Sequence, residues 1–395
     1  MMKKTGPMCL FISDLGGGGA QRMLVNLANQ FAQKGQEVHL VVFQGIGDYW
    51  DILSPEIKIF ILNKHGLGIL LPFTKYLWKE RPCSILSFML TPNIIAIIAN
   101  VLSLWQARLV ISERITYSKV ELNSLEWLTG KSLFAKNSLK KIFAKLFYPL
   151  ADEIIAVSKA VAEDLEEYGG YRKGRVKYIY NPTITPELFV LAKEEPQHRW
   201  LNEDVPVILA VGRLNPQKNY SLLIEAFAEL RKSLKAKLII LGDVFMPEEK
   251  EEKIKLVKLI DELGIKEDVD LAGFQKNPYA FMSRTDLFVL SSDFEGLPNV
   301  LIEALACAAP VGATDCASGP REILAGGKYG ILVPVGDKDK LAAAMKSALH
   351  NLESHKKMTM DFQREAMQQF TREYAAEKYL DVLLKRESDR SPNGS

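Results

Sequence analysis

Segments with the pattern of β-strands alternate with segments of helical pattern along almost the whole chain. In the first half, we expect strands at 8–14, 37–43, 57–62, 83–88, 108–112, 153–157 and 176–179. In the second half, we expect strands at 205–212, 236–241, 268–272, 286–290, 309–312 and 330–333. Strands that alternate with helices form parallel sheets, because each helix carries the chain back to the same edge. The alternation therefore predicts the α/β class.

The length of the chain predicts more than one domain. At 395 residues, two domains of about 180 residues are more probable than a single one. A less regular segment with several prolines, at 181–206, separates the two halves. We therefore predict one domain at 1–185 and a second at 186–369. A long helical pattern lies near 356–386, and the polar residues 387–395 have the composition of a disordered tail.

Cysteine usage and apolar runs bear on localisation. The four cysteines are scattered and form no C-x-x-C pair, so we expect buried, reduced thiols in a cytoplasmic protein. The first residues, MMKKTGPMCLFISDL, lack a small-residue cleavage site and predict a strand instead of a signal peptide. The apolar stretch at 85–105 is long enough to span a bilayer, but Pro92 and Asn93 divide it. We predict a buried strand–turn–helix unit there.

Two glutamates eight residues apart stand in the most informative part of the chain. Glu295 lies in a Gly/Pro loop, and Glu303 lies in the apolar helix that this loop opens. A helix start offers free N–H groups and a positive dipole end beside Glu295, which suits a polyhydroxylated, phosphorylated ligand such as a sugar nucleotide. An acidic loop before an ordinary core helix is the alternative. This alternative would explain two glutamates alone. It does not explain the residues that accompany them, which are Gly296, Leu297, Pro298 and Asn299 between the glutamates and the SGPRE segment at 318–322.

This segment resembles the E-x7-E motif of family 4 of the retaining GT-B glycosyltransferases, and the likeness extends to Ala309–Val311 and Asp315. The resemblance implies two Rossmann-like domains that face each other across a cleft. The N-terminal one would bind the acceptor and the C-terminal one the nucleotide sugar, with a final helix at about 370–386 returning to the N-terminal domain. It also implies that Glu295 binds hydroxyls of the donor sugar and that Glu303 binds the ribose.

Other residues of the donor site follow from the same resemblance. Arg213 and Lys218 lie after the strand at 205–212, where α/β sheets bind ligands, and the family places both on the donor diphosphate. Solvated surface charges are the alternative. The nucleobase would lie at Gly273 and Phe274. The glycine run Gly16–Gly19 lacks the spacing of the dinucleotide fingerprint, yet it leads into a helix N-terminus suited to phosphate. The resemblance places Gly17, Gly18 and Gly19 on the donor diphosphate and the acceptor side, against the alternative of a plain strand-to-helix turn.

Two D-x-D triplets, at 268–270 and 337–339, are similar to a metal-binding motif of the other large glycosyltransferase fold. The first enters a predicted strand, and the second precedes a predicted helix beginning near Lys338, which Asp337 would cap. We therefore predict structural roles for both triplets. We expect no metal and no cofactor.

The acceptor side is less well defined. Many family members carry a histidine there, but the strand ending at Ile111 continues Ser112-Glu113-Arg114. This triplet resembles a subgroup that acts on amino sugars and polyprenyl-linked acceptors, so we assign Glu113 and Arg114 to the acceptor side. A surface Glu–Arg pair is the alternative.

The basic segment at 131–148 has five lysines and no acidic residue. It predicts either an interfacial helix on anionic lipid or a core helix with a solvated lysine face. Residues 1–182 hold 22 Lys/Arg and 15 Asp/Glu, a balance of +7, which favours the membrane. The lysines concerned are Lys136, Lys140, Lys141 and Lys145.

The resemblance thus implies a metal-independent, retaining transferase that moves a hexose or N-acetylhexosamine from a UDP-sugar. The acceptor would be a glycan or a polyprenyl-diphosphate-linked oligosaccharide in lipopolysaccharide, O-antigen or surface-glycan assembly. A GDP-mannose mannosyltransferase and a non-catalytic sugar-nucleotide-binding protein are the alternatives. We expect a cytoplasmic protein, peripheral on the inner face of the membrane, with no nucleic-acid partner.

Overall fold

The computed structural model describes residues 6–16, 19–104, 107–114, 116, 145–244 and 249–384. The chain forms two compact units, one made of Met1–Pro182 with Arg372–Ser395 and the other of Thr183–Thr371. These limits lie close to the predicted domain boundaries. The predicted disordered tail at 387–395 lies outside the described residues.

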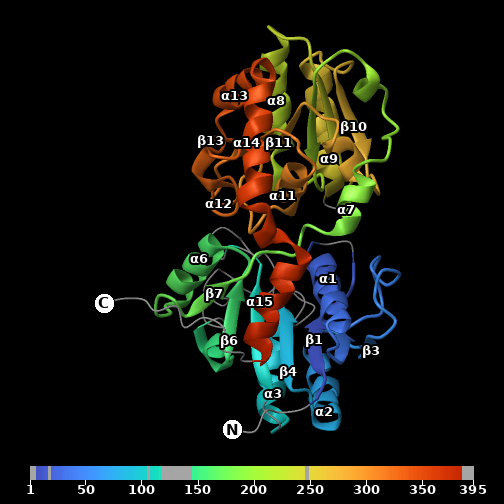
Figure 1. Ribbon diagram of the computed structural model, residues 1–395, viewed down its shortest axis with the longest axis vertical. Helices are drawn as coiled ribbons and strands as arrows, with labels where there is room; N and C mark the ends of the chain where they lie inside the picture. Colours follow the sequence, from blue (N-terminus) through green and yellow to red (C-terminus); the bar gives the residue numbers. More distant parts are fainter. Residues whose placement is uncertain are drawn as a thin grey trace. The chain divides into compact units, whose positions relative to one another are not determined.

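The first unit is built on a parallel sheet of seven strands in the order β3-β2-β1-β4-β5-β6-β7 (Figure 1). Its strands are β1 (Met8–Ile12), β2 (Val38–Val42), β3 (Lys58–Ile61), β4 (Ser84–Phe88), β5 (Arg108–Glu113), β6 (Glu153–Ala156) and β7 (Val176–Tyr178). Its helices are α1 (Gly19–Gln33), α2 (Leu70–Glu80), α3 (Leu90–Leu102), α6 (Lys159–Gly169) and α15 (Arg372–Leu384), with 3-10 turns at Gly66–Ile69 and Tyr148–Leu150.

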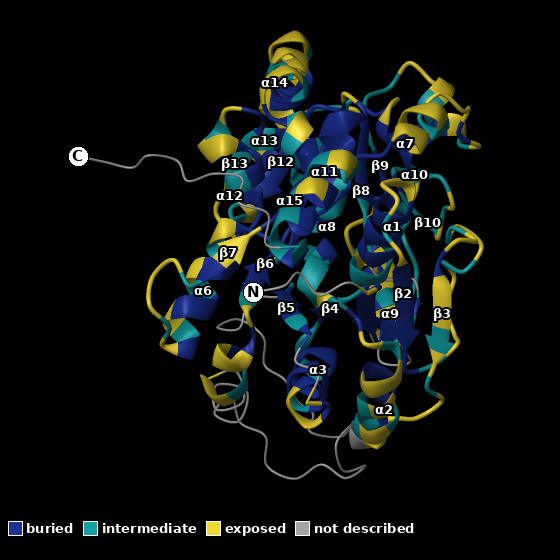
Figure 2. Cartoon of the chain, turned by 60° about the horizontal axis from the view of Figure 1, so that its bottom comes forward, coloured by how far each residue is buried: buried dark blue, intermediate teal, exposed yellow. Residues whose placement is uncertain are grey.

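Burial in this sheet follows from its topology. Every residue of β1, β2 and β4 is buried, because central strands of a parallel sheet are covered by helices on both faces. The edge strand β3 is mostly exposed. The dark strands at the centre and the yellow outer helix faces in Figure 2 show the same gradient. On one face, α1 and α15 pack together over the core, so the last helix belongs to this unit, as the resemblance implies.

The apolar stretch at 85–105 forms β4 and α3, as predicted. The break falls at Met89 (φ 75°), however, and Pro92 and Asn93 lie buried in the first turn of α3. Proline is tolerated there because the first helical N–H groups have no intrahelical partner. Among the described residues, no helix combines the length and apolar character that crossing a bilayer requires.

The second unit contains a parallel sheet of six strands in the order β10-β9-β8-β11-β12-β13. Its strands are β8 (Val207–Val211), β9 (Lys237–Leu241), β10 (Val269–Gly273), β11 (Leu287–Leu290), β12 (Val311–Thr314) and β13 (Ile331–Val333). Its helices are α7 (Pro186–Leu191), α8 (Tyr220–Arg231), α9 (Glu249–Glu262), α10 (Pro278–Met282), α11 (Asn299–Ala306), α12 (Pro320–Ile323), α13 (Lys338–His350) and α14 (Leu352–Glu365). Its 3-10 turns are Arg199–Asn202, Pro216–Lys218, Ala325–Gly327 and Met367–Phe370.

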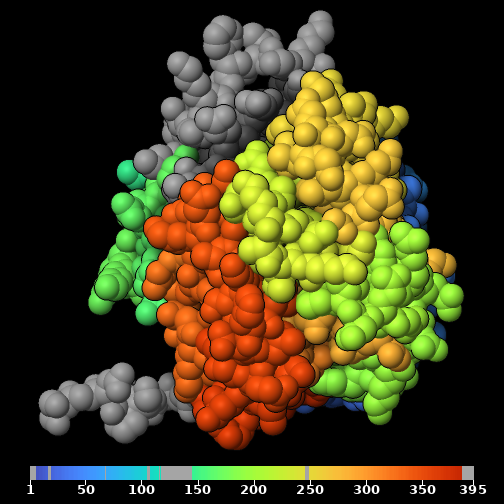
Figure 3. Space-filling model, turned by 90° about the horizontal axis from the view of Figure 1, so that it is seen from above, coloured from blue at the N-terminus to red at the C-terminus, as the bar shows by residue number. Residues whose placement is uncertain are grey.

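The core of this unit lies between β8, β9 and β11 and the helices α8 and α13, which pack against each other. Helices α13 and α14, in orange to red, form one side of the face shown in Figure 3. The prediction of one long helix near 356–386 was wrong. α14 ends at Glu365, a 3-10 turn follows, and Thr371 is extended before α15 begins. The Phe370 carbonyl accepts hydrogen bonds from the N–H groups of Thr183 and Ile184, and this pairing interrupts the helix.

The cysteines are all free thiols. Cys9, Cys307 and Cys316 are buried, as expected, whereas Cys83 is partly exposed. The expectation of four buried thiols was therefore wrong for one of them.

Candidate functional site

Three neighbouring strands of the second unit end in glycine at the carboxyl edge of the sheet. Gly212 and Gly242 follow β8 and β9, and Gly273 ends β10. Gly212 N–H donates to the Leu241 carbonyl at 2.9 Å, and Gly242 N–H donates to the Gly273 carbonyl at 2.8 Å. A Cβ atom at Gly242 would lie 1.8 Å from the Gly212 oxygen, so only glycine permits this close approach. The result is an edge of bare backbone where sheets of this class bind ligands.

Lys218 and Glu295 form an ion pair at this edge. The Lys218 Nζ atom lies 2.7 Å from Glu295 Oε1, and the two side chains are only 16% and 10% exposed. The Ser292 hydroxyl donates to the same carboxylate oxygen at 2.7 Å. The structure therefore brings together two of the predicted catalytic residues, in direct contact with each other. The interpretation of Lys218 as a solvated surface charge was wrong.

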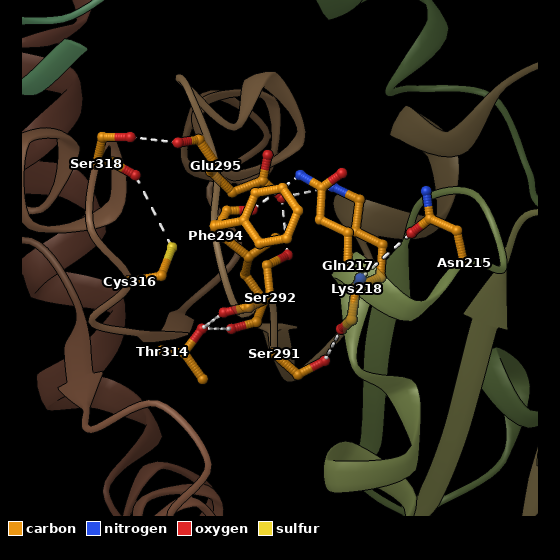
Figure 4. A network of polar contacts seen from close by, with 11 residues as sticks. Asn215, Gln217, Lys218, Ser291, Ser292, Phe294, Glu295, Thr314, Cys316 and Ser318 are labelled. Carbon is orange, nitrogen blue, oxygen red and sulfur yellow. Dashed lines mark hydrogen bonds and ion pairs between the residues drawn. The ribbon is translucent and has the colours of Figure 1, made fainter. Parts of the chain in front are cut away.

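Loop 215–219 and loop 291–295 are joined by a series of polar contacts, most of which Figure 4 shows. Gln217 Nε2 donates to the Phe294 carbonyl at 2.8 Å, and the Ser291 hydroxyl donates to the Lys218 carbonyl at 2.7 Å. Asn219 Nδ2 donates to Asp293 Oδ1 at 2.8 Å. These bonds fix the backbones that carry the lysine and the glutamate.

The SGPRE segment supports the Glu295 loop from its other side. The Ser318 hydroxyl donates to the Glu295 carbonyl (Figure 4). Gly319 has a φ of 91°, and a Cβ atom there would lie 2.4 Å from Pro298 Cδ. Glycine is required at this position for both reasons, since a left-handed φ and a close approach each disfavour a side chain. The loop at 296–298 thus packs closely against the backbone of Gly319.

Glu303 lies within α11 and is 6% exposed. The Tyr279 hydroxyl donates to its Oε1 atom at 3.2 Å. Helix α11 begins at Asn299, and Pro298 is its N-cap residue. Asn299 Oδ1 accepts from the Thr183 hydroxyl at 3.2 Å. Glu303 is therefore a buried carboxylate with a fixed orientation, in the helix that follows the Glu295 loop.

Arg213 and Phe274 are the exposed members of the predicted donor site. The Arg213 side chain is 54% exposed, and its Nη1 atom lies 3.5 Å from Glu249 Oε1. Phe274, directly after Gly273, is 60% exposed. A guanidinium and an aromatic ring thus lie at the β8–β10 end of the edge, and these are groups of the kinds that bind a phosphate and a planar base, respectively.

Glu113 and Arg114 do not form a surface pair, so that alternative was wrong. Glu113 ends β5 and is 1% exposed, and its carboxylate accepts from Asn93 Nδ2 at 2.9 Å and from the Tyr148 hydroxyl. Arg114 donates to Asn181 Oδ1 at 3.0 Å and lies over the Phe88 ring at 4.7 Å. Burial lowers the pKa of Arg114 to about 10. Both residues lie at the carboxyl edge of the first sheet, inside a polar cluster.

The glycine run and the basic segment are described only in part. Gly19 begins α1, and the Asp14 carboxylate accepts from the Gly16 N–H at 2.9 Å. Lys145 is exposed. The other predicted residues of these two segments lie outside the described residues, namely Gly17, Gly18, Lys136, Lys140 and Lys141.

The two D-x-D triplets have structural roles. Asp268 is paired with Arg231 and Lys237 at 2.7 Å and 2.9 Å, and Asp270 lies 3.1 Å from His198. Asp337 caps α13 by accepting from the Lys340 N–H at 3.0 Å. No group of three or more potential metal ligands occurs within the described ranges.

The sequence did not single out Ser292 or Tyr279, although each contacts one of the two glutamates. Ser292 precedes Glu295 by three residues, and this spacing is common in many loops. Tyr279 is 24 residues from Glu303 and reaches it only through the packing of α10 on α11. No local pattern could have identified either residue.

Two units with parallel sheets, one of which carries a lysine–glutamate cluster at its carboxyl edge, define the class of GT-B glycosyltransferases. Residues 17–185 match the family model of Glycosyltransferase Family 4, and residues 192–364 match that of Glycosyl transferases group 1. The chain belongs to this glycosyltransferase family. The family is the one that the motif of Glu295 and Glu303 resembles.

Individual relatives match most of the chain. An N-acetylgalactosamine-N,N'-diacetylbacillosaminyl-diphospho-undecaprenol 4-alpha-N-acetylgalactosaminyltransferase of Campylobacter jejuni is 34% identical over 366 residues, which cover 89% of this chain and 91% of the relative. The lipopolysaccharide core biosynthesis glycosyltransferase LpsE of Rhizobium meliloti is 28% identical and covers 93% and 96%. The crystal structure of HepE from Anabaena in complex with UDP has a TM-score of 0.76 at 20% identity, covering 96% of this chain and 100% of that one, and shows the same fold.

Proposed function

We propose that this glycosyltransferase transfers a hexose or N-acetylhexosamine from a UDP-sugar to a polyprenyl-diphosphate-linked oligosaccharide, with retention of anomeric configuration. The observation that carries the proposal is the 34% identity, over 89% of the chain, to an enzyme whose name describes transfer of N-acetylgalactosamine onto an undecaprenyl-diphosphate-linked glycan. A second Campylobacter jejuni N-acetylgalactosaminyltransferase, 26% identical over 94% of the chain, also acts on such a glycan by its name. The acceptor subgroup that Ser112-Glu113-Arg114 resembles is of the same kind.

The donor site supplies charges of the required sign. As the bond between the anomeric carbon and the diphosphate breaks, its electron pair leaves with the diphosphate, and Lys218 and Arg213 stabilise the growing negative charge. Glu295 binds sugar hydroxyls while the ring becomes cationic, and Glu303 binds the ribose hydroxyls. The acceptor hydroxyl attacks from the face that the diphosphate leaves and gives its proton to a diphosphate oxygen. The glutamates therefore orient the donor and are not the acid and base of a hydrolase.

Calorimetry with UDP, GDP and ADP, followed by an acceptor assay, tests this function. We expect UDP to bind most tightly. We then expect transfer from one of UDP-glucose, UDP-galactose, UDP-N-acetylglucosamine or UDP-N-acetylgalactosamine to a synthetic polyprenyl-diphosphate glycan. Tighter binding of GDP together with transfer from GDP-mannose would replace the proposal by a mannosyltransferase. Donor binding without turnover, with or without acceptor, would leave a sugar-nucleotide-binding protein.

We further propose that the protein meets its acceptor at the membrane surface through the basic segment at 131–148. The exposed Lys145 and the acid-free run of lysines before it support this contact. Each lysine near anionic lipid contributes about 1 kcal/mol, which salt screens. Changing Lys136, Lys140, Lys141 and Lys145 together to Glu should abolish sedimentation with anionic liposomes and spare turnover of a short, water-soluble acceptor. A wild-type protein that ignores such liposomes at low salt would contradict the contact.

A further inference from the structure

The hydroxyl group of Tyr220 is buried next to the donor site without a hydrogen bond. Tyr220 is the first residue of α8 and is 3% exposed. Its hydroxyl oxygen makes no hydrogen bond within the described part of the chain. Such a group costs free energy, because folding removes it from water and returns no partner. A phenylalanine would fill the same space without that cost, so the hydroxyl requires an explanation.

Gly212 locates this hydroxyl relative to the ion pair. A Cβ atom at Gly212 would lie 2.8 Å from the Tyr220 hydroxyl oxygen and 3.0 Å from Lys218 Cε. The hydroxyl and the end of the lysine stem therefore lie side by side over a glycine that leaves them room. Burial raises the pKa of Tyr220, and the charge of Glu295 raises it further, so the hydroxyl keeps its proton.

The ammonium group of Lys218 has two partners in the proposed reaction, first the Glu295 carboxylate and then the diphosphate of the donor. At present the ammonium donates to Glu295 at 2.7 Å. In the proposed reaction it must face the diphosphate, while Glu295 turns its oxygens to the sugar hydroxyls. The ammonium has three N–H donors and can serve several acceptors at once, provided that they lie around it. Rotation about the Cδ–Cε bond moves the ammonium while the stem stays beside Gly212.

We propose that Tyr220 is a positioning residue for Lys218, whose ammonium donates a hydrogen bond to the Tyr220 hydroxyl when it turns from Glu295 toward the diphosphate of the nucleotide sugar. This inference rests on the proposed function, in which Lys218 contacts the diphosphate. The hydroxyl lies beside the end of the lysine stem and makes no hydrogen bond within the described structure. It gives the lysine a second stable position, and the loss of the Glu295 contact is then offset by a new hydrogen bond.

The test is a double-mutant cycle read with UDP and UMP by calorimetry, on the full-length protein. UMP lacks the distal phosphate, so its affinity reports the rest of the site. We expect Tyr220→Phe to weaken UDP by about tenfold, the scale of losing a hydrogen bond to a charged group, and to leave UMP within about twofold. In a Lys218→Met background, Tyr220→Phe should change UDP affinity by less than about twofold, because the interaction has already been removed. The thermal unfolding midpoint of Tyr220→Phe should equal or exceed that of the wild type.

Tyr329→Phe is the matched control, since the Tyr329 hydroxyl donates to Glu365 at 3.0 Å away from the site, and it should bind both nucleotides normally. Wild-type UDP affinity in Tyr220→Phe would overturn the inference. Equal losses for UDP and UMP, or the same loss with and without Lys218, would also overturn it and indicate a purely structural tyrosine. Failure of the proposed function is visible separately. A wild-type protein that prefers GDP refutes the uridine donor, and the same cycle with GDP and GMP then decides the role of Tyr220. Unchanged UDP affinity in Lys218→Met would overturn both the role of Tyr220 and the proposed contact of Lys218 with the diphosphate.

Discussion

Replacing Glu295 by glutamine separates two roles of this carboxylate, which are the ion pair with Lys218 and the proposed binding of the donor sugar. Glutamine has nearly the same size and keeps an acceptor for the Ser292 hydroxyl, but it removes the charge that Lys218 faces at 2.7 Å. Breaking a fully buried pair costs about 3–5 kcal/mol, and breaking an exposed pair costs about 0–1 kcal/mol. Since these side chains are 10% and 16% exposed, we expect a loss of about 1–3 kcal/mol in the free energy of unfolding. In a unit of this size, each kcal/mol lowers the unfolding midpoint by about 2–4 °C.

The same variant should bind nucleotide diphosphate as well as the wild type or more tightly. In the unliganded site the Glu295 carboxylate competes with the incoming diphosphate for the Lys218 ammonium, and glutamine is a weaker competitor. Transfer should fall by about 10²-fold or more, because the carboxylate stabilises the sugar only as it becomes cationic.

Calorimetry with UDP, thermal unfolding and the transfer rate at saturating donor measure the three effects. Glu365→Gln serves as the control, since Glu365 pairs with Lys328 on the surface of the same unit and should alter none of them. A Glu295→Gln protein that transfers sugar at the wild-type rate would refute the assignment. A UDP affinity reduced more than about tenfold, measured below the unfolding midpoint of the variant, would refute the competition between carboxylate and diphosphate.

Three further expectations concern the donor site. Glu303→Ala should weaken UDP binding by about 1.5–3 kcal/mol, measured by calorimetry, because a buried carboxylate loses its ribose hydrogen bonds; unchanged affinity would remove Glu303 from the site. Arg213→Ala should lower kcat by about 10²-fold with little change in the unfolding midpoint, since its pair with Glu249 leaves the guanidinium 54% exposed; a normal kcat would place the diphosphate elsewhere. Transfer should persist in EDTA, since lysine, arginine and backbone N–H groups stabilise the negative charge on the leaving diphosphate. If EDTA abolished transfer and added Mg²⁺ or Mn²⁺ restored it, the enzyme would require a metal.

Most of the fold was predictable because its information is local. Each predicted strand corresponds to a strand of the two sheets, since short apolar runs bounded by polar or glycine residues are typical of buried parallel strands. The apolar face of α1, with Met23, Leu24 and Phe31, was likewise predictable from its helical period. The helix break between Glu365 and Arg372 was not predictable, because it depends on the pairing of Phe370 with Thr183 and Ile184, far away in sequence.

Candidate residues for the site could be named from the sequence, but their contacts could not. Glu295, Glu303 and Lys218 stand in recognisable motifs, and the structure brings Glu295 and Lys218 into contact. Their supports do not stand in such motifs. Gln217 and Phe294 meet across 77 residues of sequence, and Glu113 accepts a hydrogen bond from Tyr148, which lies 35 residues away. Contacts of this kind arise from tertiary packing, to which local patterns are insensitive.

The first unit should lose stability as the pH falls below neutrality, because of a buried histidine. His39 lies in β2, is 1% exposed, and its Nδ1 atom is 3.0 Å from the Tyr76 hydroxyl. Burial lowers the pKa of His39, and the nearby Glu37 opposes this only in part. In the unfolded chain the pKa of His39 returns to about 6.5. Below that pH the imidazole is protonated in the unfolded state but stays neutral in the folded state. The stability is therefore complete above about pH 6.5 and declines by up to about 1.4 kcal/mol per pH unit until the folded pKa is reached.

Hydrogen exchange of the amides of β1 and β2, corrected for the intrinsic pH effect, measures this unit separately from the other. The free energy of opening should fall between pH 7.5 and 5. His39→Gln, which keeps a polar partner for Tyr76, should show a flatter dependence. Lys58 lowers the pKa of the neighbouring Glu37, so the contribution of that carboxylate is complete above the usual pKa range of glutamate and is lost only as the pH falls through that range, outside the interval measured. The same slope in His39→Gln as in the wild type would show that another group is responsible, because removing the imidazole removes the only proton that this explanation invokes.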